Sequence, residues 1–112
     1  VVKFFSIVYN SLPQQADEVE PMMNIVVWKE GLDTVSVIFP RHKHRPDCYS
    51  KEGNEQYLIS PGALDMGGLL ILPRQTDFER IDEKLLMEVM QEIVLPAETM
   101  QEVTEKIRNK GE

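Results

Sequence analysis

The side chains best suited to chemistry lie together in one short segment. Residues 40–51 read Pro-Arg-His-Lys-His-Arg-Pro-Asp-Cys-Tyr-Ser-Lys and hold both histidines, the single cysteine and four of the 12 lysines and arginines. The chain as a whole is acidic, with a formal net charge of −7, so this segment is a local exception. Physiological salt screens exposed charges over about 8 Å, so a bound anion would experience these cations more than distant carboxylates. The segment therefore predicts a site for an anionic ligand such as phosphate.

Two other chemistries deserve comparison with anion binding. His42 and His44 are two residues apart and would point the same way on an extended strand, as metal ligands can. A closed zinc site needs four ligands and an open one about three, and only Asp47 and Cys48 stand nearby. Cationic neighbours could lower the pKa of Cys48, but no oxyanion donors or orienting third residue can be identified. We therefore assign no metal, no cofactor and no catalytic residue, and expect an inert, partly buried thiol.

Anion binding has more support from the pattern of the segment. Extending the alternation of the preceding strand places three cations on one face as the strand leaves the core: Arg41, Lys43 and Arg45. Arginine presents a planar fork of donors that matches phosphate oxygens, and His44 can add a further hydrogen bond. We predict that these four residues bind substrate. The alternative is a solvated basic turn that discourages pairing at a sheet edge.

Length and composition limit the class of protein. A chain of 112 residues with 42% hydrophobic content fits one domain with a real core. The negative charge argues against nucleic-acid and anionic-membrane partners, which are engaged through basic surfaces. One cysteine forms no internal disulfide, and no run approaches the roughly 20 apolar residues of a membrane span, so we expect a cytoplasmic protein. Because the chain starts without methionine, inside a structured segment, we expect a C-terminal fragment of a longer protein.

The first half of the chain predicts a helix and a hairpin. Apolar residues at spacings of three and four indicate a helix over residues 1–11, which Pro13 ends. A polar loop follows over residues 14–21. Residues 22–29 form a nearly unbroken apolar run and residues 34–40 alternate, which predicts a β-hairpin. Because the first strand is apolar on both faces, we expect it inside a sheet with cover on each side and Trp28 largely buried.

The second half predicts short strands and two clear helices. We expect a short strand over 56–59, a helical turn started by Ser60 and Pro61, a break at 67–68, and a buried strand over 69–72. Asp82 can cap a helix whose apolar stripe extends to Ile93. Pro96 then allows a last helix, which Gly111 can terminate.

The chain also resembles a known family. The residues that carry the resemblance are Met23-Asn24-Ile25-Val26-Val27-Trp28, Ile38-Phe39-Pro40-Arg41, His44-Arg45-Pro46, Tyr49, Ile59-Ser60-Pro61, Asp65-Met66-Gly67-Gly68, Ile71 and Asp77-Phe78. They are similar to the C-terminal part of an uncharacterised bacterial family over roughly residues 1–95. That family resembles the histidine-triad-like phosphorylases, such as GDP-L-galactose phosphorylase and diadenosine tetraphosphate phosphorylase.

The resemblance implies an α+β sheet fold and nucleotidyl transfer through a histidine nucleophile. The family motif alternates histidines with apolar residues, whereas residues 42–46 interleave cations and end in proline. The catalytic role is therefore not carried over to His42 or His44. In such enzymes the motif lies upstream, so this chain would be the C-terminal portion and would contribute cations around the substrate's phosphates or sugar.

The combined prediction is one α+β domain, residues 1–112, with a largely antiparallel sheet flanked by helices and a histidine-triad-like C-terminal character. Its expected function is the substrate side of a nucleotide or nucleotide-sugar phosphorylase or nucleotidyltransferase. The expected partners are a nucleotide or sugar-phosphate substrate and the missing N-terminal portion of the same protein, and a homo-oligomer is a further expectation because an uncovered sheet should self-associate. The alternative function is a non-catalytic scaffold or dimerisation domain with an incidental basic loop.

Overall fold

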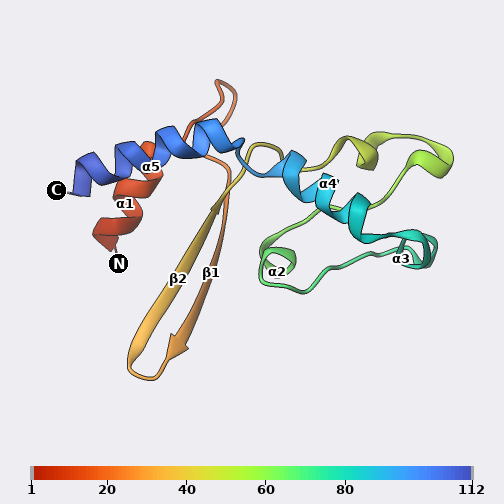
Figure 1. The fold of residues 1–112 in the computed structure, drawn as a ribbon, viewed down its shortest axis with the longest axis horizontal. Helices are drawn as coiled ribbons and strands as arrows, with labels where there is room; N and C mark the ends of the chain where they lie inside the picture. The colour runs from red at the N-terminus through yellow and green to blue at the C-terminus, as the bar shows by residue number, and fades with distance from the viewer. Residues whose placement is uncertain (1, 112) are drawn as a thin grey trace.

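A computed structural model describes residues 2–111 and has an α+β architecture (Figure 1). The described residues contain one two-stranded antiparallel sheet and five α-helices. The elements are α1 (Val2–Ser11), β1 (Met23–Glu30), β2 (Asp33–Pro40), α2 (Ala63–Met66), α3 (Gln75–Arg80), α4 (Glu83–Ile93) and α5 (Ala97–Gly111). Two 3-10 turns, Asp47–Ser50 and Gly53–Glu55, lie between β2 and α2.

The first and last helices pack against each other and form the largest part of the core. Val8 on α1 and Leu12 just after the helix are buried with Leu95 and with Val103 on α5. The Ser11 hydroxyl is also buried and donates to the Ile7 carbonyl oxygen at 2.7 Å, which satisfies it within the helix. Both predicted helices are confirmed, and the first residue of the predicted range lies outside the described residues.

The predicted hairpin is confirmed, but its expected cover is not. Strands β1 and β2 pair in register from Met23 opposite Pro40 to Glu30 opposite Asp33, and Gly31 turns the chain with a φ of 63°. A positive φ suits glycine because it has no Cβ. The two strands form the whole sheet among residues 2–111, so Trp28 is 41% exposed and the prediction of a buried Trp28 is wrong for this chain.

The two further strands predicted from the sequence are absent from the structure of residues 2–111 for different reasons. Residues 56–59 are extended, but Asp77 on α3 and Arg74 just before it bind their backbone in place of a neighbouring strand. Residues 69–72 lie at the surface, with Leu69 and Ile71 exposed. Short apolar runs do not distinguish a sheet strand from an extended surface segment, because that depends on a partner strand far away in the sequence.

Among the helices between residues 60 and 93, α4 follows its local signals closely and the two shorter helices do not. The Asp82 carboxylate accepts from the Leu85 N–H at 2.8 Å and caps α4, whose Val89 and Ile93 are buried as predicted. The turn α2 starts later than predicted: the Gly62 N–H donates to Asp65 Oδ2 at 2.8 Å, and Ser60 lies outside the helix. The short helix α3 was not predicted.

The molecule is extended for its length. Figure 1 shows the hairpin projecting from between the α1–α5 pair and the part of the chain that carries α2, α3 and α4. The radius of gyration is 16.2 Å, compared with about 13 Å for a compact domain of this length. Among the described residues, no helix is both long and apolar enough to cross a membrane.

Candidate functional site

Arg41 is buried and binds the chain around it. Its Nε and Nη2 donate to the Lys43 carbonyl oxygen at 3.2 and 3.0 Å, and Nη2 donates to that of His44 at 2.8 Å. Its Nη1 donates to Asn24 Oδ1 at 2.9 Å and to the Pro61 carbonyl oxygen. All five guanidinium N–H groups are thus used within the chain, and burial lowers the pKa of Arg41. Arg41 connects β1, the basic segment and the loop before α2.

The backbone around Arg41 explains why the predicted alternation of cations fails. Strand β2 ends at Pro40, and the Arg41 N–H donates to the Met22 carbonyl oxygen at 2.9 Å. The next residue, His42, donates its N–H to the Ile93 carbonyl oxygen at 2.7 Å, at the end of α4. The chain therefore turns onto α4 and does not continue as a strand, so the three cations do not share one strand face.

Lys43 forms salt bridges with two carboxylates, Asp47 and Glu92, and these three residues are called the Lys43 clamp. The Lys43 Nζ lies 2.6 Å from Asp47 Oδ1 and 2.8 Å from Glu92 Oε2. The same Glu92 oxygen accepts the Asp47 N–H at 2.8 Å. The hydrogen bonds that Lys43 donates to Asp47 and Glu92 raise the pKa of Lys43, and the hydrogen bond from Lys43 lowers the pKa of Asp47. The clamp holds the start of the turn Asp47–Ser50 onto α4 and largely neutralises the lysine.

His44 and Arg45 are the members of the predicted set that reach outward. Both are exposed, and His44 Nε2 lies 3.4 Å from Glu18 Oε1. The Arg45 guanidinium carbon stands 4.2 Å from the centroid of the Tyr49 ring, which is a cation–π distance. The structure therefore separates the four predicted residues into an interior pair, Arg41 and Lys43, and an exposed pair. Their part in anion binding stays a prediction.

A cleft of about 450 Å³ lies near Arg45. Tyr49 forms part of its wall, so Arg45, which covers the Tyr49 ring, lies next to the cleft. The lining is mainly apolar with a few polar groups, and includes Leu58, Ser60, Asp65, Ile71 and Pro73. An aromatic ring, a hydroxyl and a carboxylate around a mainly apolar cleft of this size are typical of a small-molecule site.

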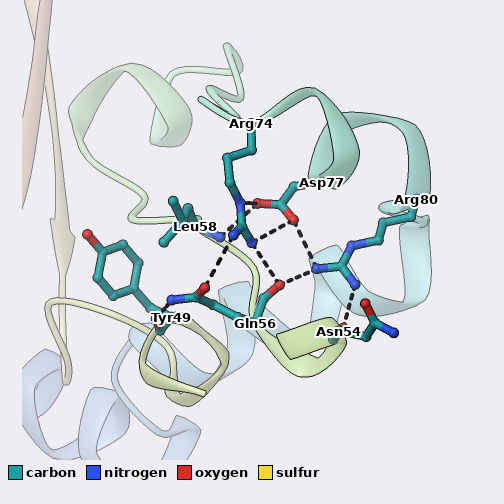
Figure 2. A network of polar contacts seen from close by, with 7 residues as sticks. All are labelled: Tyr49, Asn54, Gln56, Leu58, Arg74, Asp77 and Arg80. Atoms are coloured by element: carbon teal, nitrogen blue, oxygen red, sulfur yellow. Dashed lines mark hydrogen bonds and ion pairs between the residues drawn. The ribbon is translucent and has the colours of Figure 1, made fainter. Parts of the chain in front are cut away.

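The wall of this cleft is held by a buried carboxylate (Figure 2). Asp77 on α3 has no exposed surface and accepts from Arg74 Nε at 2.9 Å and Nη2 at 3.1 Å. It also accepts from Arg80 Nη2 at 2.9 Å and from the Leu58 N–H at 2.9 Å. Hydrogen bonds from Arg74 are the largest cause that lowers the pKa of Asp77 to about 2. The carboxylate is therefore ionised and fixes Leu58, a residue of the cleft wall.

Both arginines also bind the backbone of the loop at residues 54–56. Figure 2 shows Arg74 and Arg80 converging on Gln56: Arg74 Nη2 donates to its carbonyl oxygen at 3.0 Å, and Arg80 Nη2 donates to the same oxygen. Arg80 also binds the Asn54 carbonyl oxygen and lies 3.8 Å from the centroid of the Tyr57 ring. This network was not predicted from the sequence. Its signal was the Arg-x-x-Asp-x-x-Arg spacing at 74, 77 and 80: Asp77 and Arg80 are three residues apart on α3, and Arg74 immediately precedes the helix.

The remaining reactive side chains of the segment show no catalytic arrangement. Cys48 is half-buried, and burial followed by the nearby Glu92 charge raises the pKa of its thiol, which disfavours the thiolate. His42 is exposed, and with Arg41 it lines a second hollow of about 280 Å³ between the polar loop and the start of α5. Residues 2–111 bring together no group of three His, Cys, Asp or Glu side chains suited to a metal ion.

Comparison with protein families assigns the chain. The family model described as "GDPGP1-like, C-terminal domain" matches residues 6–112. The chain belongs to this family. The resemblance to the C-terminal part of a GDP-L-galactose phosphorylase-like family, seen in the sequence, is therefore confirmed, and the match extends beyond residue 95 to include α5. No curated protein and no solved structure matches the chain.

Proposed function

We propose that this GDPGP1-like domain is the C-terminal part of a longer phosphorylase-like protein and forms the substrate-side wall of its active site. The substrate would be a nucleotide or a nucleotide sugar, and the nucleophile would come from the portion that precedes this domain. Membership of the GDPGP1-like C-terminal domain family is the observation that carries the proposal.

The cleft beside Tyr49 and the exposed Arg45 next to it would bind different parts of the nucleotide. A volume of about 450 Å³ can hold a base or a sugar, and the Tyr49 ring offers a stacking surface. Arg45 would then meet the phosphates with its forked donors, and His44 would add one hydrogen bond. Arg41 holds the segment in position from inside, and the salt bridges from Lys43 to Asp47 and Glu92 fix it onto α4.

The chemistry assigned to these residues is charge neutralisation. Phosphoryl and nucleotidyl transfer place negative charge on phosphate oxygens, and fixed cations near those oxygens lower the barrier if they are aligned before the reaction. Arg41, with all its donors bound to the chain, and the Lys43 clamp provide that alignment. No bond-making step is assigned to a residue of this chain.

Nucleotide binding by the protein that contains this domain and the portion preceding it tests the proposal. GDP, ADP and inorganic phosphate are titrated into the wild type and into Arg45→Ala, Arg45→Lys and Arg108→Ala variants. Arg108 is exposed on α5, so its removal matches the charge change at a distance. Arg45→Ala should weaken nucleotide binding by about tenfold or more, because hydrogen bonds to charged groups contribute about 1.5 to 3 kcal/mol. Equal affinities of the Arg45→Ala and Arg108→Ala variants would contradict the proposal.

A non-catalytic scaffold or dimerisation domain is the second candidate function. The internal use of Arg41 and the neutralisation of Lys43 favour it, because two of the four cations then serve the fold. This reading predicts a folded protein that binds none of the three ligands in the titration.

A further inference from the structure

The chain exposes more surface than a compact monomer of its mass. Its accessible area is 8072 Å², whereas a compact 12.9 kDa protein exposes about 6,300 Å². The difference, about 1,800 Å², exceeds the roughly 800 Å² that each partner contributes to an interface of standard size. The area is sufficient for a stable interface with another protein surface.

Much of the exposed apolar surface lies on the β1–β2 hairpin. One face carries Ile25 and Val27, the opposite face carries Trp28, and Leu32 at the turn is fully exposed. Figure 1 shows the tip of the hairpin directed away from α1 and α5, while α2 lies in contact with β1. A lone two-stranded hairpin is marginally stable in water. Apolar side chains on both faces therefore indicate cover that residues 2–111 do not provide.

The charged residues and the proline of the two strands stand at the strand ends, at Lys29, Glu30, Asp33 and Pro40, and the central part of each edge lacks the features that protect free strands from pairing. Exposed edge strands usually carry lysines, prolines or bulges along their length. Residues 23–28 and 34–39 contain no charged residue and no proline, and the register between the strands is continuous from Met23 to Glu30. The central parts of the outer edges are therefore suited to accept another strand, and β2 is the freer of the two because α2 contacts β1.

We propose that the β1–β2 hairpin is the docking element for the portion of the same protein that precedes this domain, which adds a strand to a free edge and covers the apolar faces. The family is described as a C-terminal domain, so a preceding portion is available on the same polypeptide. Covalent linkage gives it an effective concentration in the millimolar range. A second copy of this chain is disfavoured as the partner, because two chains that each have a formal net charge of −7 repel each other. The proposal rests on the family and the exposed hairpin, and not on the nucleotide site.

Hydrogen exchange in the protein that contains the preceding portion tests this docking. In an antiparallel strand, alternate N–H groups point to the outer edge and exchange rapidly unless another strand accepts them. We expect the outward amides of residues 23–40 in at least one strand to exchange at least about a hundredfold more slowly than those of the exposed loop 14–21. Rapid exchange of the outward amides in both strands would overturn the proposal.

A matched pair of substitutions gives a second readout. Val27→Asp places a charge on the hairpin, and Val19→Asp makes the same change at a loop residue that is 94% exposed. Val27→Asp should lower the Tm by about 5 °C or more and speed exchange of residues 23–40, whereas Val19→Asp should do neither. Equal effects of the two variants would overturn the proposal. A concentration-dependent dimer in sedimentation that Val27→Asp converts to monomer would overturn it too, because the occupant would be a second copy.

Discussion

The Asp77 carboxylate receives a bidentate hydrogen bond from Arg74, three residues earlier in the chain, with N–O distances of 2.9 and 3.1 Å. Helix α3, which starts after Arg74, is only six residues long, and a helix of that length does not persist alone in water. The pair therefore stabilises the helix as well as the loop that it binds. Because that loop includes Leu58, the pair also sets the wall of the cleft beside Tyr49.

The low pKa of Asp77 predicts a loss of stability in acid. Its folded pKa of about 2 lies below the ordinary value of 3.8, so the carboxylate stabilises the fold fully above about pH 4. That contribution, about 2 kcal/mol, is lost as pH falls from about 4 to about 2. Urea denaturation between pH 7 and pH 2 should show this decline in the wild type and a smaller decline in Asp77→Asn. Parallel curves for the two proteins would contradict the assignment.

The same residue should be sensitive to substitution at neutral pH. Asp77→Asn removes the charged partner of two half-exposed guanidinium groups, Arg74 and Arg80, and weakens the hydrogen bonds to them, which should cost about 1.5 to 3 kcal/mol of unfolding free energy. The matched control is Asp17→Asn, the same change at an exposed loop residue, and it should cost less than about 0.5 kcal/mol. Denaturant titration at pH 7 measures both. Similar costs for the two variants would mean that the network contributes little.

Local signals in the sequence were sufficient for some elements and not for others. The apolar stripe of α4 and its Asp82 cap depend on residues within one or two turns, and both were predicted. The hairpin was also predicted, because its strands are adjacent in the chain. Cover for the hairpin and pairing for residues 56–59 depend on contacts distant in sequence or outside the chain, and no periodicity encodes such contacts.

The candidate site shows the same limit. Composition identified the basic segment, but it could not show that Arg41 turns inward to Pro61 while Arg45 turns outward to Tyr49. That division depends on where β2 ends against α4, which is a tertiary contact. The Asp77 network was not predicted because it depends on a short helix, α3, with only six residues and no long apolar stripe, and on the loop at residues 54–58 that the helix binds.

Arg41 should tolerate even a conservative change poorly. Arg41→Lys keeps the charge but replaces a fork of five donors with an ammonium that cannot reach all four acceptor residues. The acceptors left buried without donors should cost about 2 to 4 kcal/mol of unfolding free energy. Arg45→Lys, the same change at an exposed position four residues later, should cost less than about 1 kcal/mol. Denaturant titration of both variants checks the ranking, and a more costly Arg45→Lys would contradict it.

Cys48 should react slowly with alkylating reagents, in agreement with its raised pKa. Burial and the Glu92 charge disfavour the thiolate, which is the reactive form. Glu92→Gln removes that charge and should speed modification at pH 8, whereas Glu88→Gln, at an exposed position one turn earlier on α4, should not. The rate of iodoacetamide labelling at several pH values measures this. If Glu88→Gln accelerates labelling as much as Glu92→Gln, a nonspecific loosening of α4 is responsible.

Trp28 distinguishes a free hairpin from a covered one. Trp28 and Phe78 are both exposed in this chain, at 41% and 69%, so truncation of either to alanine here removes a partly solvated ring. In the protein that also contains the preceding portion, docking would bury Trp28 and leave Phe78 on α3 unchanged. Trp28→Ala should then cost about 3 to 5 kcal/mol of unfolding free energy, the cost typical of a buried aromatic side chain, and Phe78→Ala less than about 1 kcal/mol. Equal small costs in denaturant titration would leave the hairpin without its proposed partner, because an uncovered Trp28 contributes little more than any exposed ring.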